Sequence, residues 1–133
     1  MKRTTIFKIL TLLYLAAVAV LCFARFSSLP TVPGRFLGLD ADKVVHFLMF
    51  LPFPILAFLS FPLDRKGLFA TLCSIVCIFI LGAALAGVTE YVQGHLPYRK
   101  MDINDFKADM LGLLTASLIT FFIRLMTHPR KNA

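Results

Sequence analysis

The sequence contains no tryptophan and few charged residues, and its 133 residues include no polar stretch long enough to form a separate soluble domain. Charged side chains make up 16% of the chain, compared with about 25% in soluble globular domains. Hydrophobic residues reach 59%, and the mean hydropathy is +0.82. These features argue against an ordinary soluble domain and predict a single membrane domain built from long apolar segments.

Cysteines are also scarce, and their odd number of three argues against a disulfide framework. Cys73 and Cys77 lie four residues apart, on one face of a predicted helix, but no histidine or acidic residue lies near them. We therefore interpret them as small apolar fillers rather than metal ligands. The sequence also lacks a nucleophilic serine motif, a phosphate-binding glycine loop and a transporter repeat.

The apolar residues fall into four runs, at about 6–24, 44–61, 68–93 and 105–126. Each run is about long enough to cross a bilayer as a helix. The pattern predicts an all-α bundle of about four transmembrane helices that forms one domain over residues 1–133. The first run is longer than the core of a usual signal peptide, so we expect it to remain as a helix. Pro52 and Pro54 predict a kink in the second run.

Small residues are concentrated in the second half of the third run. Ala83 and Gly87 lie four residues apart, which places them on one face of a helix. Small residues at this spacing let a neighbouring helix approach closely, so we predict that Gly87 packs against another helix at close range.

Charged residues suggest how the helices are oriented. Six of the seven acidic residues lie on the side of the membrane opposite the two termini, whereas the turn at Arg65 and Lys66 is basic. Positive charge favours the cytoplasmic side, so we predict that both termini are cytoplasmic. The net charge of +7 is explained by lipid headgroups beside the helix ends, and we do not expect nucleic-acid binding.

Three groups of polar residues lie at the same predicted end of the bundle. They contribute nine candidate ligand-binding residues: Asp42, Lys43, His46, Glu90, Gln93, Arg99, Asp102, Asp105 and Asp109. Asp42 and His46 share a helix face, as do Glu90 and Gln93. Helix capping and headgroup anchoring are simpler explanations for the groups nearest the helix ends. Because ionisable groups at membrane depth are costly unless paired, we predict one shared polar pocket.

These residues also carry a family resemblance. The order Asp-Lys-x-x-His, Glu-x-x-Gln, Arg and then Asp-x-x-Asp-x-x-x-Asp-x-x-Gly, between Asp42 and Gly112, resembles the VanZ-like family of bacterial membrane proteins. The resemblance implies a multi-pass protein of the bacterial inner membrane and cell envelope, with a link to glycopeptide-antibiotic resistance. Many members of the family have Asn where this chain has Asp109, which is compatible with hydrogen bonding or metal coordination there.

Three functions follow from the sequence, in this order. The first is binding of a lipid-linked or cell-wall headgroup, with Arg99 and Lys100 suited to its phosphate or carboxylate groups. The second is a membrane enzyme acting on a lipid-linked substrate, with Glu90, Asp105 and His46 as catalytic candidates. A divalent metal ion is its candidate cofactor, with His46, Glu90, Asp105 and Asp109 as candidate ligands.

The third is an aspartyl intramembrane protease that uses a pair of acids such as Glu90 and Asp105. Membrane lipids are the expected partners, and a lipid-linked cell-wall precursor is a further candidate. The sequence leaves the ligand, the reaction and the oligomeric state open.

Overall fold

The computed structural model describes residues 2–23, 35–36, 39–61, 67–98 and 100–128. Its helices are α1 (Arg3–Phe23), α2 (Ala41–Phe50), α3 (Pro52–Leu59), α4 (Leu68–Gly94) and α5 (Ile103–Thr127). The short strand β1 (Arg35–Phe36) pairs antiparallel with β2 (Leu39–Asp40). Within the described residues, four helical segments are long and apolar enough to cross a membrane, which confirms the predicted helical membrane fold.

The second spanning segment runs from Asp42 to Leu59 and is divided at Leu51 into α2 and α3. Pro52 and Pro54 have no backbone N–H, so they cannot donate the hydrogen bonds that would continue the helix through this point. The break therefore lies where the prolines predict it. At the first helix the apolar run underestimates the length, because α1 already begins at the polar residue Arg3.

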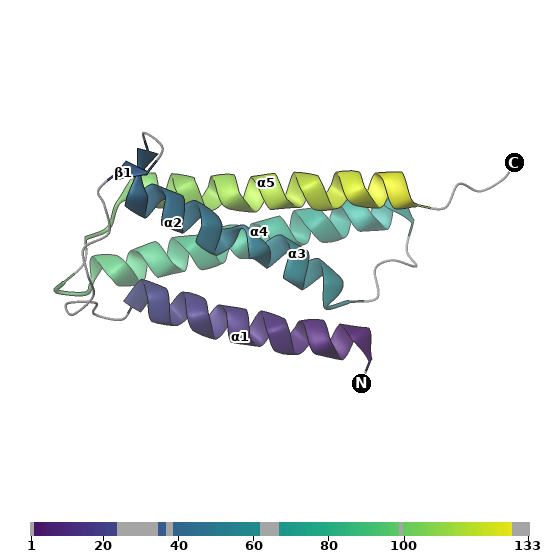
Figure 1. Cartoon of the computed structure of the whole chain (residues 1–133), viewed down its shortest axis with the longest axis horizontal. Helices are drawn as coiled ribbons and strands as arrows, with labels where there is room; N and C mark the ends of the chain where they lie inside the picture. Colours follow the sequence, from purple (N-terminus) through teal and green to yellow (C-terminus); the bar gives the residue numbers. More distant parts are fainter. Residues whose placement is uncertain (1, 24–34, 37–38, 62–66, 99, 129–133) are drawn as a thin grey trace, which may run out of the picture.

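The long helices cross the bundle side by side, and α2 and α3 lie between α1 and α5 (Figure 1). The beginning of α1 and the end of α5 lie at one end of the bundle. The beginning of α2, the end of α4 and the beginning of α5 lie together at the other end. Three polar sequence groups that are far apart in the chain therefore meet at one end.

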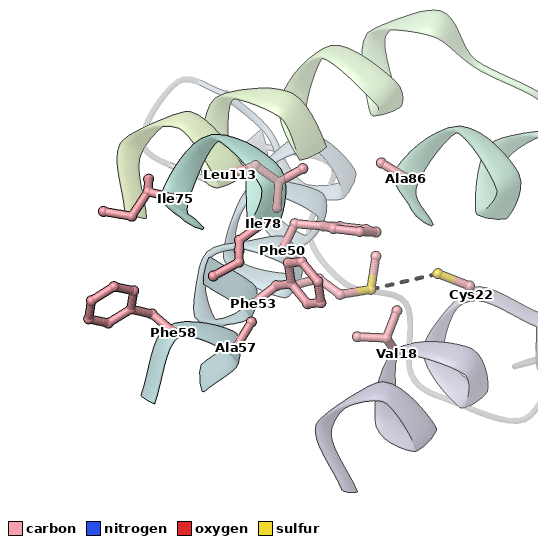
Figure 2. Packing of buried hydrophobic residues seen from close by; sticks show 11 residues of the cluster. Val18, Cys22, Phe50, Phe53, Ala57, Phe58, Ile75, Ile78, Ala86 and Leu113 are labelled. Carbon is pink, nitrogen blue, oxygen red and sulfur yellow. Dashed lines mark hydrogen bonds between the residues drawn. The ribbon is translucent and has the colours of Figure 1, made fainter. Parts of the chain in front are cut away.

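The apolar core draws on every helix (Figure 2). Phe50 and Leu113 are completely buried, and Phe53 packs in the same cluster. From α1 the cluster receives Val18 and Cys22, and the Cys22 thiol lies 3.8 Å from the sulfur of Met49. Large apolar side chains on the outer faces remain exposed, as expected for a surface that meets lipid.

Two glycines permit close approach between helices. A Cβ atom on Gly82 would lie 2.6 Å from Cδ2 of Leu113, and one on Gly112 would overlap the carbonyl oxygen of Phe47. At Gly87 the nearest atom would be Cε2 of Phe106 at 3.8 Å, an ordinary contact. The prediction of close packing at Gly87 is therefore wrong. The spacing of small residues shows that a helix can approach, but not which face it uses.

Hydrogen bonds attach α1 to the rest of the bundle. Tyr14 donates from its hydroxyl group to the carbonyl of Met49, and the hydroxyls of Thr11 and Ser60 lie 3.0 Å apart. Gln93 of α4 donates from Nε2 to the carbonyl oxygen of Cys22 at 2.9 Å. These polar contacts supplement a small apolar interface, because the buried residues of α1 are only Val18 and Cys22.

Candidate functional site

A histidine and an aspartate from distant parts of the chain form the centre of the polar end. His46 lies on α2, and its Nδ1 atom is 2.8 Å from Oδ1 of Asp109 on α5. Asp109 is fully buried and lies nearly two turns inside α5. Gly112, one turn further along α5, lets this helix lie against the backbone at Phe47, the residue after His46. The close approach at Gly112 brings the imidazole and the carboxylate together.

Two more carboxylates surround the same imidazole ring. Oδ2 of Asp105 is 3.5 Å from Nε2 of His46, and Oε1 of Glu90 is 4.0 Å from Nδ1. His46 is 8% exposed, Glu90 is 4% exposed and Asp109 is not exposed at all. Buried carboxylates in such a place require compensating charge or hydrogen bonds, because transfer of an isolated charge from water is very costly.

Glu90 is also held by the beginning of α5. The backbone N–H of Asp102 donates to Oε2 of Glu90 at 3.2 Å. Asp102 is the N-cap residue of α5, and its side chain accepts a hydrogen bond from the N–H of Asn104 at 2.8 Å. A helix N-terminus carries partial positive charge, so a carboxylate is favoured there. The capping interpretation therefore holds for Asp102. The side chain of Glu90, a residue of α4, is held by the beginning of α5.

Lys43 neutralises the acidic residues at the rim of this group. Its Nζ atom lies 2.7 Å from Oδ2 of Asp102 and 2.8 Å from Oδ2 of Asp42, and it also contacts Oδ1 of Asp105. The hydrogen bond from Lys43 holds the pKa of Asp102 below its usual range, so this carboxylate remains ionised at neutral pH. Lys43 is thus already paired with carboxylates.

Two carboxylate oxygens at the centre of the polar end lack a hydrogen-bond partner among the described residues. Within the part of the chain that the structure describes, Oε1 of Glu90 and Oδ2 of Asp109 are buried and accept no hydrogen bond. One side-chain ligand atom from each of His46, Glu90 and Asp109 can be chosen so that all three lie within 4.8 Å of one another. This geometry is compatible with a metal ion, and the mixture of imidazole and carboxylate ligands suits Zn²⁺ or Mn²⁺.

Salt bridges and hydrogen bonds connect seven of the nine sequence-predicted residues, and six of them, all but the exposed Asp42, form a more buried group. We call this group the polar cluster, and it consists of Lys43, His46, Glu90, Asp102, Asp105 and Asp109. Asp42 contacts Lys43, but its side chain is 60% exposed at the rim. Gln93 points elsewhere, because it binds the α1 carbonyl of Cys22. The predicted role of Arg99 lies outside the described residues.

A pocket that the sequence reasoning missed lies beside the polar cluster. Its volume is about 310 Å³, and it is lined by Gly87, Glu90, Tyr91, Met101, Asp102, Ile103 and Phe106. Apart from Glu90 and Asp102, which also belong to the polar cluster, its walls are largely apolar. The available signal was Gly87, since a residue without a side chain leaves space where the neighbouring helix does not pack tightly against it.

Comparison with known proteins gives an uncharacterized relative and no matching family profile. No protein-family profile matches the chain, and no solved structure resembles it significantly. An uncharacterized protein of Schizosaccharomyces pombe is 31% identical over 90 residues, which cover 68% of this chain and 50% of the yeast protein. The chain therefore spans about half the length of the curated relative it matches. The VanZ-like resemblance continues to depend on the motif residues between Asp42 and Gly112.

Proposed function

We propose that the polar cluster binds a divalent metal ion through His46, Glu90 and Asp109, and that this ion holds the phosphate of a membrane lipid headgroup. The observation that carries the proposal is the pair of buried carboxylate oxygens, on Glu90 and Asp109, that accept no hydrogen bond among the described residues. A metal ion between them and His46 would satisfy both.

Charge favours a cation as the first ligand. When both are ionised, Glu90 and Asp109 would carry two negative charges, and a single divalent ion beside a neutral His46 would balance them. Lys43, at the rim of the polar cluster, is already paired with Asp102, Asp105 and Asp42. Direct binding of phosphate at the carboxylates of the polar cluster would therefore meet repulsion, whereas phosphate binding through a metal ion would not.

The number of protein ligands favours a metal ion with one open coordination position. Structural zinc sites usually have four protein ligands, and three protein ligands leave a position for water or substrate. Two groups of described residues satisfy the geometry, and the buried one has three members, His46, Glu90 and Asp109. The acids of the other, Asp42, Asp102 and Asp105, are already paired with Lys43. A phosphate oxygen of a lipid headgroup would fill the open position.

The location of the site is part of the same proposal. We place it at the side of the membrane opposite the two termini, on the outer face of a bacterial inner membrane, as the distribution of acidic residues and the VanZ-like motif order suggest. A role in glycopeptide-antibiotic resistance would belong to this setting. The relative in a yeast is a reason to test a headgroup common to many membranes before a cell-wall precursor.

A metal-dependent membrane enzyme is the second candidate, because the same open position would activate a bound water. Turnover of a lipid headgroup in the presence of metal would distinguish it from simple binding. The geometry gives an aspartyl protease less support. Glu90 and Asp105 approach different nitrogens of the His46 ring, and Asp105 is paired with Lys43, whereas such enzymes need two acids that share one proton.

The direct test is metal binding by the purified full chain in detergent. We would remove metal with a chelator and titrate Mn²⁺ into wild-type protein and into Glu90→Gln, following free Mn²⁺ by electron paramagnetic resonance. We expect one bound ion for the wild type and at least about 100-fold weaker binding for Glu90→Gln, which loses a charged ligand.

Asp42→Asn is the matched control, because it removes one negative charge from the same end of the bundle at an exposed position. It should bind Mn²⁺ within about threefold of the wild type, since exposed charges are screened. Equal weakening by both substitutions would show a diffuse electrostatic effect and contradict the site. Failure of the wild type to bind Mn²⁺ or Zn²⁺ would overturn the metal proposal.

A further inference from the structure

We infer that the apolar pocket between α4 and the beginning of α5 holds a hydrocarbon chain of the lipid whose phosphate is bound at the polar cluster. This inference rests on the proposed function for its headgroup, but the pocket adds a second and separate requirement. It makes the ligand an amphiphile with a tail, rather than a free phosphate or a soluble phosphate ester.

The pocket and the polar cluster are continuous. Glu90 and Asp102 line the pocket and also belong to the polar cluster, where the N–H of Asp102 binds Oε2 of Glu90. A molecule in the pocket would therefore have one end at these polar groups. Its remaining length would lie among apolar side chains, chiefly Tyr91, Met101 and Phe106.

The position of the pocket indicates what occupies it. Three of its wall residues lie at the outer surface of the bundle, since Tyr91 is 64% exposed, Met101 is 66% exposed and Ile103 is 63% exposed. They flank the ends of two membrane-spanning helices, α4 and α5. In a bilayer such a surface meets lipid chains and headgroups, so a membrane lipid is the amphiphile available at this opening.

The size of the pocket fits part of a lipid rather than a whole one. Its volume of about 310 Å³ lies at the lower limit of the usual range for ligand pockets, about 300–1,000 Å³. A segment of one chain fits this space, with the remainder in the bilayer. Gly87 lines this space, and a Cβ there would have only an ordinary contact, 3.8 Å from Phe106.

This geometry allows the pocket to be filled without disturbing the bundle. Gly87→Leu would project a side chain into the pocket, whereas Gly87→Ala adds a single methyl group that fits. We would titrate dioleoyl phosphatidic acid and glycerol 3-phosphate into metal-free and Mn²⁺-loaded protein in detergent, using native mass spectrometry for the lipid and calorimetry for the soluble ester.

We expect Mn²⁺-loaded wild type to bind phosphatidic acid at least about tenfold more tightly than glycerol 3-phosphate, because the tail is buried. Gly87→Leu should lose about tenfold in lipid affinity, with binding of Mn²⁺ and glycerol 3-phosphate unchanged. Gly87→Ala should resemble the wild type. Ile103→Asn, at an exposed wall position, should also weaken lipid binding without changing the binding of Mn²⁺ or glycerol 3-phosphate. It provides a second test if Gly87→Leu does not fold.

The outcomes separate the two proposals. Equal lipid affinity in wild type, Gly87→Leu and Ile103→Asn, with Mn²⁺ still bound, would overturn the tail pocket and leave the metal site intact. Lipid binding that depends on Gly87 but not on Mn²⁺ would support the pocket and contradict the metal-held headgroup. Equal affinity of the wild type for phosphatidic acid and glycerol 3-phosphate would also overturn the tail pocket.

Discussion

Helices α1 and α5 both cross the whole bundle, but they differ in what they contribute. The spanning window of α1 is the more apolar, with a mean hydropathy of 2.4, yet only 11% of it is buried within the chain. The corresponding values for α5 are 1.7 and 22%. Hydropathy alone does not explain this difference, because α4 is the most apolar of the spanning helices and is buried to the same extent as α5. The difference lies in what each helix buries: α1 buries Val18 and Cys22, whereas α5 buries the polar residues Asp109 and Ser117.

The two helices are also held by different forces. The inner face of α5 contains a glycine that touches backbone and an aspartate that binds an imidazole, so shape and charge must both match. The attachment of α1 depends on a few hydrogen bonds and on Val18 and Cys22. We therefore expect substitutions on the inner face of α5 to have larger effects than those on α1.

The largest effect is expected for Gly112→Leu. Any side chain there would overlap the carbonyl oxygen of Phe47, and backbone cannot move aside as a flexible side chain can. We expect a loss of more than about 3 kcal/mol in the free energy of unfolding, seen as loss of the monodisperse peak in size-exclusion chromatography. Gly67→Ala is the control, because a Cβ there meets no atom within 4 Å. Similar yields for both variants would show that α5 does not approach α2 as closely as described.

A smaller but substantial effect is expected for His46→Leu. This substitution removes the hydrogen-bond partner of the buried Asp109 carboxylate, at a cost of about 1–3 kcal/mol in metal-free protein. The measurement is thermal unfolding in detergent. In the double variant His46→Leu/Asp109→Leu we expect partial recovery, because no buried charge remains at either position. If the double variant were less stable than His46→Leu, the pair would not be coupled in this way.

Gln93→Leu tests the attachment of α1. It removes the hydrogen bond to the carbonyl of Cys22, and we expect a destabilisation of about 1 kcal/mol. Because Gln93 points toward α1 rather than toward the polar cluster, Mn²⁺ affinity should be unchanged. A variant that retained full stability but lost Mn²⁺ binding would return Gln93 to the site in which the sequence first placed it.

The smallest effect is expected for Cys73→Ala and Cys77→Ala. Both residues are exposed on α4, so each substitution should change the free energy of unfolding by less than about 0.5 kcal/mol. Cys22→Ala is the matched comparison, since Cys22 is 1% exposed and packs in the core, and about 1 kcal/mol is expected there. Metal content measured for all three variants would show any role of these thiols as ligands, which we do not expect.

Much of the polar cluster was accessible from the sequence, because each of its charges follows or precedes a long apolar run. That pattern singled out His46, Glu90 and Asp109 and indicated a common end of the bundle. It did not separate Gln93 from them, because Gln93 lies one turn from Glu90 on the same face of the helix. The two side chains diverge because Glu90 meets the beginning of α5, while Gln93 meets the end of α1.

The sequence by itself determined the four spanning segments and the break at the prolines. It could do so because a backbone in lipid must satisfy its hydrogen bonds within each helix, so length and apolar composition suffice. Tertiary structure alone decided which residues meet. His46 and Asp109 are 63 positions apart, and their contact depends on how α2 and α5 are rotated and how closely Gly112 lets them approach. The same rotation left Gly87 facing a pocket instead of a tightly packed helix, since spacing along one helix does not specify the surface of its neighbour.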